Sequence, residues 1–397
     1  MTAATVARAR ELPRADVRER WVISEEARAI VLVSACLLVF GLAVLYSASA
    51  IEAINRGRDG TYYLIRQLTG AGIGVIAFMV AAKVDAERWR AWAWPLMWVT
   101  LVTLLLVLVL PNDIAPRING SKRFLYSTSF QPSELGKFAV VVWTAMLVVK
   151  KGDRLRGFSR GLVPFLVVLL ALCVLAAAEP DLSVAILYTL LMAIVLFAGG
   201  VRIAHFVLLG ALALPWLWVE IERVQYALLR LVSFLDPGQA PSAGYQLRQS
   251  LLAVGSGGTF GAGYGEGRQQ YGFLPYPYSD FIASNVGEEW GFLGLAALTL
   301  AFGAYALYGF RIARAARSPF LQLVAVGLTF TTVLTAYVHI GVVIGLLPTT
   351  GLTLPFVSYG RSNLVLTMFL TGVLVNIGSR RDRVVGTGAT DPLTRRA

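Results

Sequence analysis

One long stretch interrupts the apolar segments of the chain: GYQLRQSLLAVGSGGTFGAGYGEGRQQYGFLPYPYSDFIASNVGEEWGFLG, from Gly244 to Gly294. Its many glycines, with Pro275 and Pro277, favour an irregular backbone, and loops held on a rigid scaffold often carry function. Asp280 follows these prolines, just before the chain becomes apolar again. Two interpretations are open from this chemistry alone. Asp280 is a functional acid at a membrane boundary, or it lies in a solvated loop and caps the helix that follows.

Outside this stretch the composition is that of a membrane protein. Of the 397 residues, 57% are hydrophobic and only 15% are charged, which lies outside the usual range of soluble domains. The apolar runs long enough to cross a bilayer are 29–50, 64–83, 91–110, 134–149, 162–178, 182–199, 203–219, 287–310, 320–347 and 363–378. The sequence therefore predicts an all-α integral membrane protein of about ten transmembrane helices, with a large extracytoplasmic loop, about residues 220–286, between helices 7 and 8.

Basic residues determine the predicted orientation. Most of the 35 Lys and Arg residues fall on one side of the predicted spans, together with both chain ends. The positive-inside tendency then places both termini in the cytoplasm. We predict a basic cytoplasmic tail at 1–28, a membrane domain at 29–378 and a cytoplasmic tail at 379–397, with residues 1–25 and the tail after Gly378 disordered. The net charge of +12 reflects this topology and affinity for anionic lipid heads, and does not indicate nucleic-acid binding.

The second predicted outer loop carries several ionisable residues. Asn119-Gly120 is a turn signal, and Lys122 and Arg123 follow it. Glu134 lies in the first turn of the next predicted helix, and Lys137 lies three residues further into it. An ionisable residue inside a membrane helix is costly and is a functional candidate by default. The alternative is a structural Glu134–Lys137 pair whose lysine extends to the interface.

The last predicted outer loop is GLLPTTGLTLPFVSYGRSN, residues 345–363, which Pro and Gly interrupt and Arg361 nearly ends. Irregular backbone at membrane depth is tolerated only where it is buried in protein or lines a cavity. The outer loops offer neither a His/Cys cluster for zinc nor a Ser–His–Asp set. They do offer an acid and several basic groups. That combination suits a donor with a lipid-linked pyrophosphate leaving group, because cations stabilise the departing phosphate and a carboxylate takes the acceptor's proton.

Eight short motifs are highly specific when they occur together. They are YSAS at 46–49, NGSKRF at 119–124, QPSELGK at 131–137, PDLSVA at 180–185, GYQLRQSLLAVGSGG at 244–258, LPYPYSDFI at 274–282, GEEWGF at 287–292 and LPFVSYGRS at 354–362. With these motifs the chain resembles the SEDS proteins (shape, elongation, division and sporulation), the FtsW/RodA group of peptidoglycan glycosyltransferases, over essentially all predicted spans. The NG, GYQ and PFVSYG elements are more similar to the division branch than to the elongation branch.

The resemblance implies roles for the matching residues. Asp280 is implied as the catalytic base, and Arg123, Glu134 and Lys137 match residues linked to activity. The implied substrate-binding residues are Lys122, Arg123, Glu134, Lys137, Gln246, Gln249, Ser250, Glu289, Ser358 and Arg361.

The chain departs from the family pattern at three places. Tyr276-Pro277-Tyr278 stands where the family usually has Glu-Ala-His, Arg361 stands for a glycine and His339 stands for an asparagine. The implied catalytic acid is retained.

The resemblance implies an enzyme that polymerises lipid II on the outer leaflet of the bacterial cytoplasmic (inner) membrane during cell division. The implied partners are lipid II (the undecaprenyl-pyrophosphate-linked disaccharide peptide), a class B penicillin-binding transpeptidase, other division proteins and membrane lipids. No metal ligands and no cofactor are identified, and a divalent cation is left open. Two alternatives are open as well: a lipid II flippase, since intramembrane charges also suit a transporter, and a non-catalytic scaffold that recruits a transpeptidase.

Overall fold

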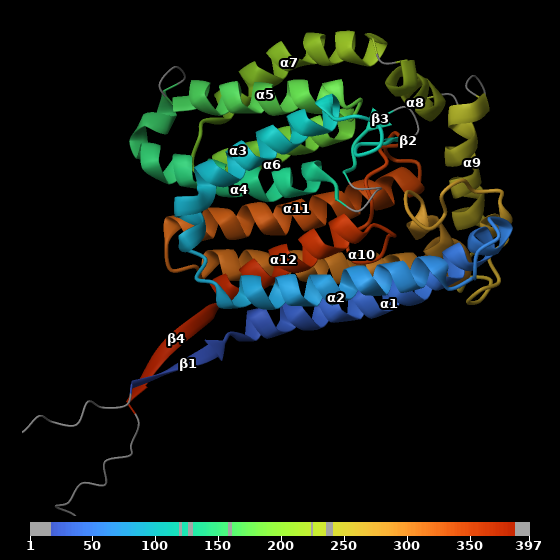
Figure 1. Cartoon of the computed structure of the whole chain (residues 1–397), viewed down its shortest axis with the longest axis horizontal. Helices are drawn as coiled ribbons and strands as arrows, with labels where there is room; N and C mark the ends of the chain where they lie inside the picture. Colours follow the sequence, from blue (N-terminus) through green and yellow to red (C-terminus); the bar gives the residue numbers. More distant parts are fainter. Residues whose placement is uncertain are drawn as a thin grey trace, which may run out of the picture.

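The computed structural model describes residues 17–118, 121–125, 130–157, 161–223, 225–235 and 241–385. The helices are α1 (Glu25–Asn55), α2 (Tyr62–Lys83), α3 (Arg88–Val109), α4 (Pro132–Lys151), α5 (Val163–Ala178), α6 (Leu182–Ala198), α7 (Ile203–Arg223), α8 (Gln225–Leu235), α9 (Pro241–Ser256), α10 (Ile282–Arg314), α11 (Pro319–Val343) and α12 (Arg361–Ile377). Most of the long helices lie side by side, and two strands, β1 (Val17–Ile23) and β4 (Ser379–Val385), extend from one end of the bundle (Figure 1). We call the opposite end the distal end; it carries α8, α9 and the short strands β2 (Arg117–Ile118) and β3 (Ser121–Lys122).

The predicted all-α membrane fold is confirmed. Among the described residues, six helices are long and apolar enough to cross a membrane, namely α1, α2, α3, α10, α11 and the segment Pro132–Leu155, which contains α4. Three shorter apolar helices, α5, α6 and α12, lie among them, and α7 coincides with the predicted span 203–219. The total of ten spans stays a prediction.

The predicted large loop is partly helical. Between residues 220 and 286, α8 and α9 form and α10 already begins at Ile282. The backbone of α10 is interrupted at Gly291, which has a φ of +66°. A Cβ at Gly291 would lie 2.6 Å from the carbonyl oxygen of Thr259, so only glycine lets the loop after α9 approach so closely.

The prediction that both tails are disordered is wrong for the segments next to the bundle. Strand β1 (Val17–Ile23) pairs antiparallel with β4 (Ser379–Val385). The cause is the position of the chain ends: α1 packs beside α12, and the Ser24 amide donates to the Gly378 carbonyl at 3.3 Å. The two exits are therefore adjacent, and the backbones continue as a ladder. The rest of both tails, 1–16 and 386–397, lies outside the described residues.

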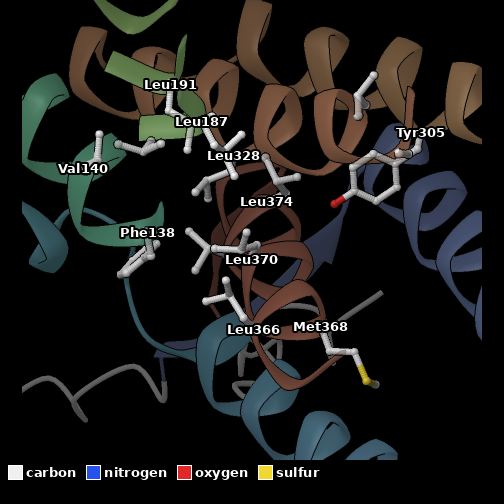
Figure 2. Packing of buried hydrophobic residues seen from close by; sticks show 14 of the residues in the cluster. Phe138, Val140, Leu187, Leu191, Tyr305, Leu328, Leu366, Met368, Leu370 and Leu374 are labelled. Carbon is white, nitrogen blue, oxygen red and sulfur yellow. The ribbon is translucent and has the colours of Figure 1, made fainter. Parts of the chain in front are cut away.

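Helix α4 lies at the centre of the bundle, with most of its residues buried. Phe138 and Val140 of α4 pack near Leu187 of α6 and Leu366 and Leu370 of α12 (Figure 2). Close packing of this kind holds membrane helices together. Lipid tails are as apolar as these side chains, so the hydrophobic effect does not drive the helices against each other. The polar residues at the start of α4 are therefore fixed in position.

Candidate active site

Asp280 lies in the loop before α10, and the segment between α11 and α12 holds that loop in place. Ser358 Oγ donates to the Ser279 carbonyl at 2.7 Å and accepts from the Leu354 amide at 2.9 Å. The Tyr359 amide donates to the Tyr278 carbonyl at 2.9 Å. Two loops some 80 residues apart in sequence thus fix the backbone on both sides of the acid.

The segment that follows α11 is in turn tied to three helices. Gln67 of α2 donates to the Ser358 carbonyl at 3.0 Å and accepts from the Gly360 amide at 3.2 Å. Ser183 of α6 donates to the Thr350 carbonyl at 2.8 Å, and His339 of α11 contacts the Leu352 carbonyl through Nδ1 at 2.8 Å. The irregular backbone predicted here is buried in protein over Leu354–Ser358.

Asp280 is a half-buried residue, and the charges of two arginines act on its carboxyl. Burial raises the pKa of this carboxyl to about 6. The positive charges of Arg230 and Arg123, and a hydrogen bond from the Ser279 side chain, act in the opposite direction. Gly351, with a φ of +75°, lies beside this acid: a Cβ there would be 4.0 Å from Asp280 Oδ2 and 3.9 Å from Arg230 Nη2. A carboxyl with a pKa near neutrality suits general base catalysis.

Arg123 is held by the turn between α5 and α6. Its Nη2 donates to the Pro180 carbonyl at 2.6 Å, and its Nε lies 3.3 Å from Asp181 Oδ2. Asp181 also caps α6 by accepting from the Val184 amide. Glu179 is buried in the same turn, where burial and the neighbouring Asp181 raise its pKa to about 8 although Arg123 opposes this. Arg123 thus lies among three carboxyl groups.

The predicted pair at the start of α4 is present. Lys137 Nζ lies 2.7 Å from Glu134 Oε1, and both side chains are buried. The lysine therefore does not extend to the interface as the structural alternative required. Lys122 donates to the Leu110 carbonyl at 2.8 Å from the hairpin of β2 (Arg117–Ile118) and β3 (Ser121–Lys122). The turn predicted at Asn119-Gly120 lies outside the described residues.

Three of the candidate substrate-binding residues hold the scaffold. Ser358 ties the two loops, Ser250 contacts the Val343 carbonyl and Ser284 Oγ at 2.8 and 2.7 Å, and Glu289 accepts from Ser47 Oγ. Gln246 and Gln249 are partly exposed on α9. Arg361 begins α12 and packs on α2, because a Cβ at Gly70 would lie 3.0 Å from Arg361 Cγ.

Sequence reasoning missed Arg230, Glu179 and Gly351. In the sequence, Arg230 is one of several charges on an amphipathic segment, and Glu179 is part of a Glu-Pro-Asp turn that reads as structural. A glycine needed for close approach carries no chemical signal. Only the packing of distant segments brings Arg230 and Gly351 to Asp280, and Glu179 to Arg123.

The fold and the site define a multi-pass helical membrane protein whose loops gather an acid and several cations at one end of the bundle. The chain belongs to the FtsW, RodA and SpoVE family, because the model of that family, described as a cell cycle protein, matches residues 27–383.

Curated relatives and solved structures agree with this membership. A probable peptidoglycan glycosyltransferase FtsW of Trichlorobacter lovleyi is 38% identical over 366 residues, covering 91% of this chain and 96% of the relative. Stage V sporulation protein E of Bacillus subtilis is 38% identical over 351 residues, covering 88% and 95%. A chain from a peptidoglycan synthase complex that coordinates polymerization and crosslinking superposes with a TM-score of 0.74, at 25% identity over 88% of this chain and 96% of that one. RodA of Thermus thermophilus gives a TM-score of 0.64 at 26% identity over 88% and 95%.

Proposed function

We propose that the protein is a peptidoglycan glycosyltransferase that polymerises lipid II during cell division, with Asp280 as the general base. The observation that carries this proposal is the Asp280 carboxyl, whose pKa is raised to about 6 and which is flanked by Arg230 and Arg123 at the distal end of the bundle. The relatives named as peptidoglycan glycosyltransferases support the reaction, and the FtsW names support the role in division.

The reaction joins two lipid-linked sugars. The 4-hydroxyl oxygen of the acceptor sugar attacks C1 of the donor sugar, the bond from C1 to the pyrophosphate oxygen breaks, and Asp280 takes the hydroxyl proton. The leaving pyrophosphate carries the developing negative charge, which Arg123 and Arg230 stabilise. Ser358 and Gln67 keep the base in place by fixing the backbone around it. Lys137 contributes less net charge, because Glu134 already neutralises it.

We further propose that the distal end faces outwards from the cytoplasmic membrane and that both termini are cytoplasmic, on the distribution of basic residues. Lipid II is the proposed substrate. A class B penicillin-binding transpeptidase is the proposed partner, supported by the likeness to a complex that couples polymerization to crosslinking.

A flippase is the second candidate, because the buried Glu134–Lys137 pair lies inside a spanning helix, where transporters also keep charges. The purified protein in liposomes with labelled lipid II separates the possibilities. Glycan polymer supports the proposal, whereas monomer moved between leaflets without polymer supports the flippase. If neither polymer nor translocated monomer is found, the result supports the non-catalytic scaffold.

A further inference from the structure

A second group of cations lies at the distal end, where α1 leads into α2. The Arg58 guanidinium carbon is 4.1 Å from the ring centroid of Tyr62, and that of Arg66 is 5.4 Å from the same centroid. Arg66 also donates to the Tyr62 hydroxyl. We call Arg58, Tyr62 and Arg66 the Tyr62 cluster. Arg58 is exposed, and Tyr62 and Arg66 are partly exposed, so a ligand can reach them.

The two arginines of this cluster differ in their pairing from the neighbouring Arg56. Within the described ranges, neither Arg58 nor Arg66 forms an ion pair with a carboxylate, whereas the neighbouring Arg56 pairs with Glu52 at 2.6 Å. In the proposed orientation this loop is outside, where basic residues oppose the positive-inside tendency. A planar guanidinium that is not paired with a carboxylate can donate two hydrogen bonds to a phosphate. A bound phosphate would balance the charge of these two cations.

A stack of aromatic rings connects the Tyr62 cluster to the catalytic loop. Tyr63 stacks on Tyr278 at 4.5 Å between ring centroids, and Tyr359 packs against these two rings at 5.1 and 5.8 Å. Tyr278 precedes Asp280 by two residues. The cluster is therefore adjacent to the Asp280 loop but set back from the acid by these rings.

We propose that Arg58 and Arg66 bind the pyrophosphate of the acceptor lipid, an inference that rests on the proposed function. Both substrates of the reaction carry a lipid pyrophosphate. The donor's pyrophosphate leaves at the reacting carbon, so it requires cations next to Asp280, and Arg123 and Arg230 are placed there.

The acceptor's pyrophosphate must bind further from Asp280. Its reacting 4-hydroxyl lies at the opposite end of the disaccharide from the phosphate, so the sugars separate the two. The acceptor's pyrophosphate is unchanged in the reaction and needs binding only. Next to Arg66 and further along α2, the side chains of Ile65, Ile73 and Ile76 are exposed. They form an apolar surface along which a polyprenyl tail can lie.

The test is a single-transfer assay with the full chain in liposomes. A lipid II analogue methylated on the 4-hydroxyl acts only as donor, and an analogue with a carbon in place of the anomeric oxygen acts only as acceptor. Each analogue is titrated while the other saturates. For the double variant Arg58→Gln with Arg66→Gln we expect the acceptor KM to rise about ten- to a hundredfold, with the donor KM and kcat unchanged. Arg268→Gln, which removes an exposed charge at the same end, is the matched control.

Each other outcome counts against the assignment. A rise in the donor KM, or no change in either KM, overturns it. The assay is repeated in phosphatidylcholine alone and with added phosphatidylglycerol, and an effect seen only with phosphatidylglycerol would show that the cluster binds bulk anionic lipid instead. The parent protein is assayed before the variants. If it makes no product from the donor analogue and the acceptor analogue together, the proposed function itself fails.

Discussion

At the scale of single residues, the chemistry depends on how the surroundings of Asp280 differ from those of an ordinary helix cap. Asp280 is not the residue that precedes α10, since Phe281 takes that position without a side-chain cap hydrogen bond. The interpretation of Asp280 as a cap is therefore weakened, and the raised pKa near two arginines fits a base. The assignment of Asp280 as the base stays a prediction.

Asp280→Asn tests that assignment, because asparagine keeps the shape but cannot accept the proton. We expect lipid II polymerisation to fall about a hundredfold or more, with membrane levels and folding retained. The rate is measured on purified protein in liposomes. Asparagine caps helices about as well as aspartate, so a variant that polymerises at the parent rate would leave Asp280 a structural residue.

The pH dependence provides a second test of Asp280. A base works only when it is deprotonated, and the pKa of this carboxyl is about 6. We therefore expect kcat/KM to fall about tenfold per pH unit below that value and to level off above it. The profile is measured between pH 5 and 8 at fixed ionic strength. A flat profile across pH 6 would contradict the role, and the residual activity of Asp280→Asn should lack the inflection.

For Glu179 we predict that losing the carboxyl does not reduce activity at neutral pH. Its pKa of about 8 means that the carboxyl is mostly protonated at pH 7, so Glu179→Gln replaces one neutral group by another of similar shape. We expect the parent rate at pH 7. Above pH 8 the parent gains a charge that competes for Arg123 and should lose activity, while the variant should not. Loss of activity at pH 7 would show that Glu179 acts as a charged group.

At the scale of elements, the site depends on two loops that the sequence places far apart. Ser358 links them, because its hydroxyl accepts from the Leu354 amide and donates to the Ser279 carbonyl. Ser358→Ala leaves both groups without this partner, at a cost of about 1–3 kcal/mol. We expect a several-fold loss of turnover, with Asp280 still required. Ser256→Ala, which breaks only a bond within α9, is the control, and equal turnover in both variants would argue against the link.

The sequence predicted the elements better than their connections. Spans are visible because a membrane requires long apolar runs, and Asp280 and Lys137 are conspicuous because ionisable groups there are costly. The contribution of Arg230 could not be predicted, because it depends on the packing that brings its guanidinium beside Gly351 and Asp280. The pairing of β1 with β4 was missed for the same reason, since it requires α1 and α12 to exit together.

At the scale of the whole molecule, the proposed function requires the distal end to face away from the cytoplasm. Lipid II is polymerised on the outer side, so Asp280 and the Tyr62 cluster must be accessible there. The excess of basic residues at the opposite end, where α10 leads into α11, predicts this orientation. The bundle itself is compatible with either orientation.

Cysteine labelling decides between the two orientations. Glu266→Cys places a thiol on the exposed loop after α9, and Ala315→Cys places one on the exposed turn after α10. Both are made in a background in which Cys36 and Cys173 are replaced by alanine. We expect an impermeant thiol reagent applied to whole cells to label the first variant and to label the second only after the membrane is opened. Labelling in the opposite order would place Asp280 on the cytoplasmic side, where it could not polymerise lipid II on the outer leaflet. The activity would then have to be assigned to a different face of the bundle.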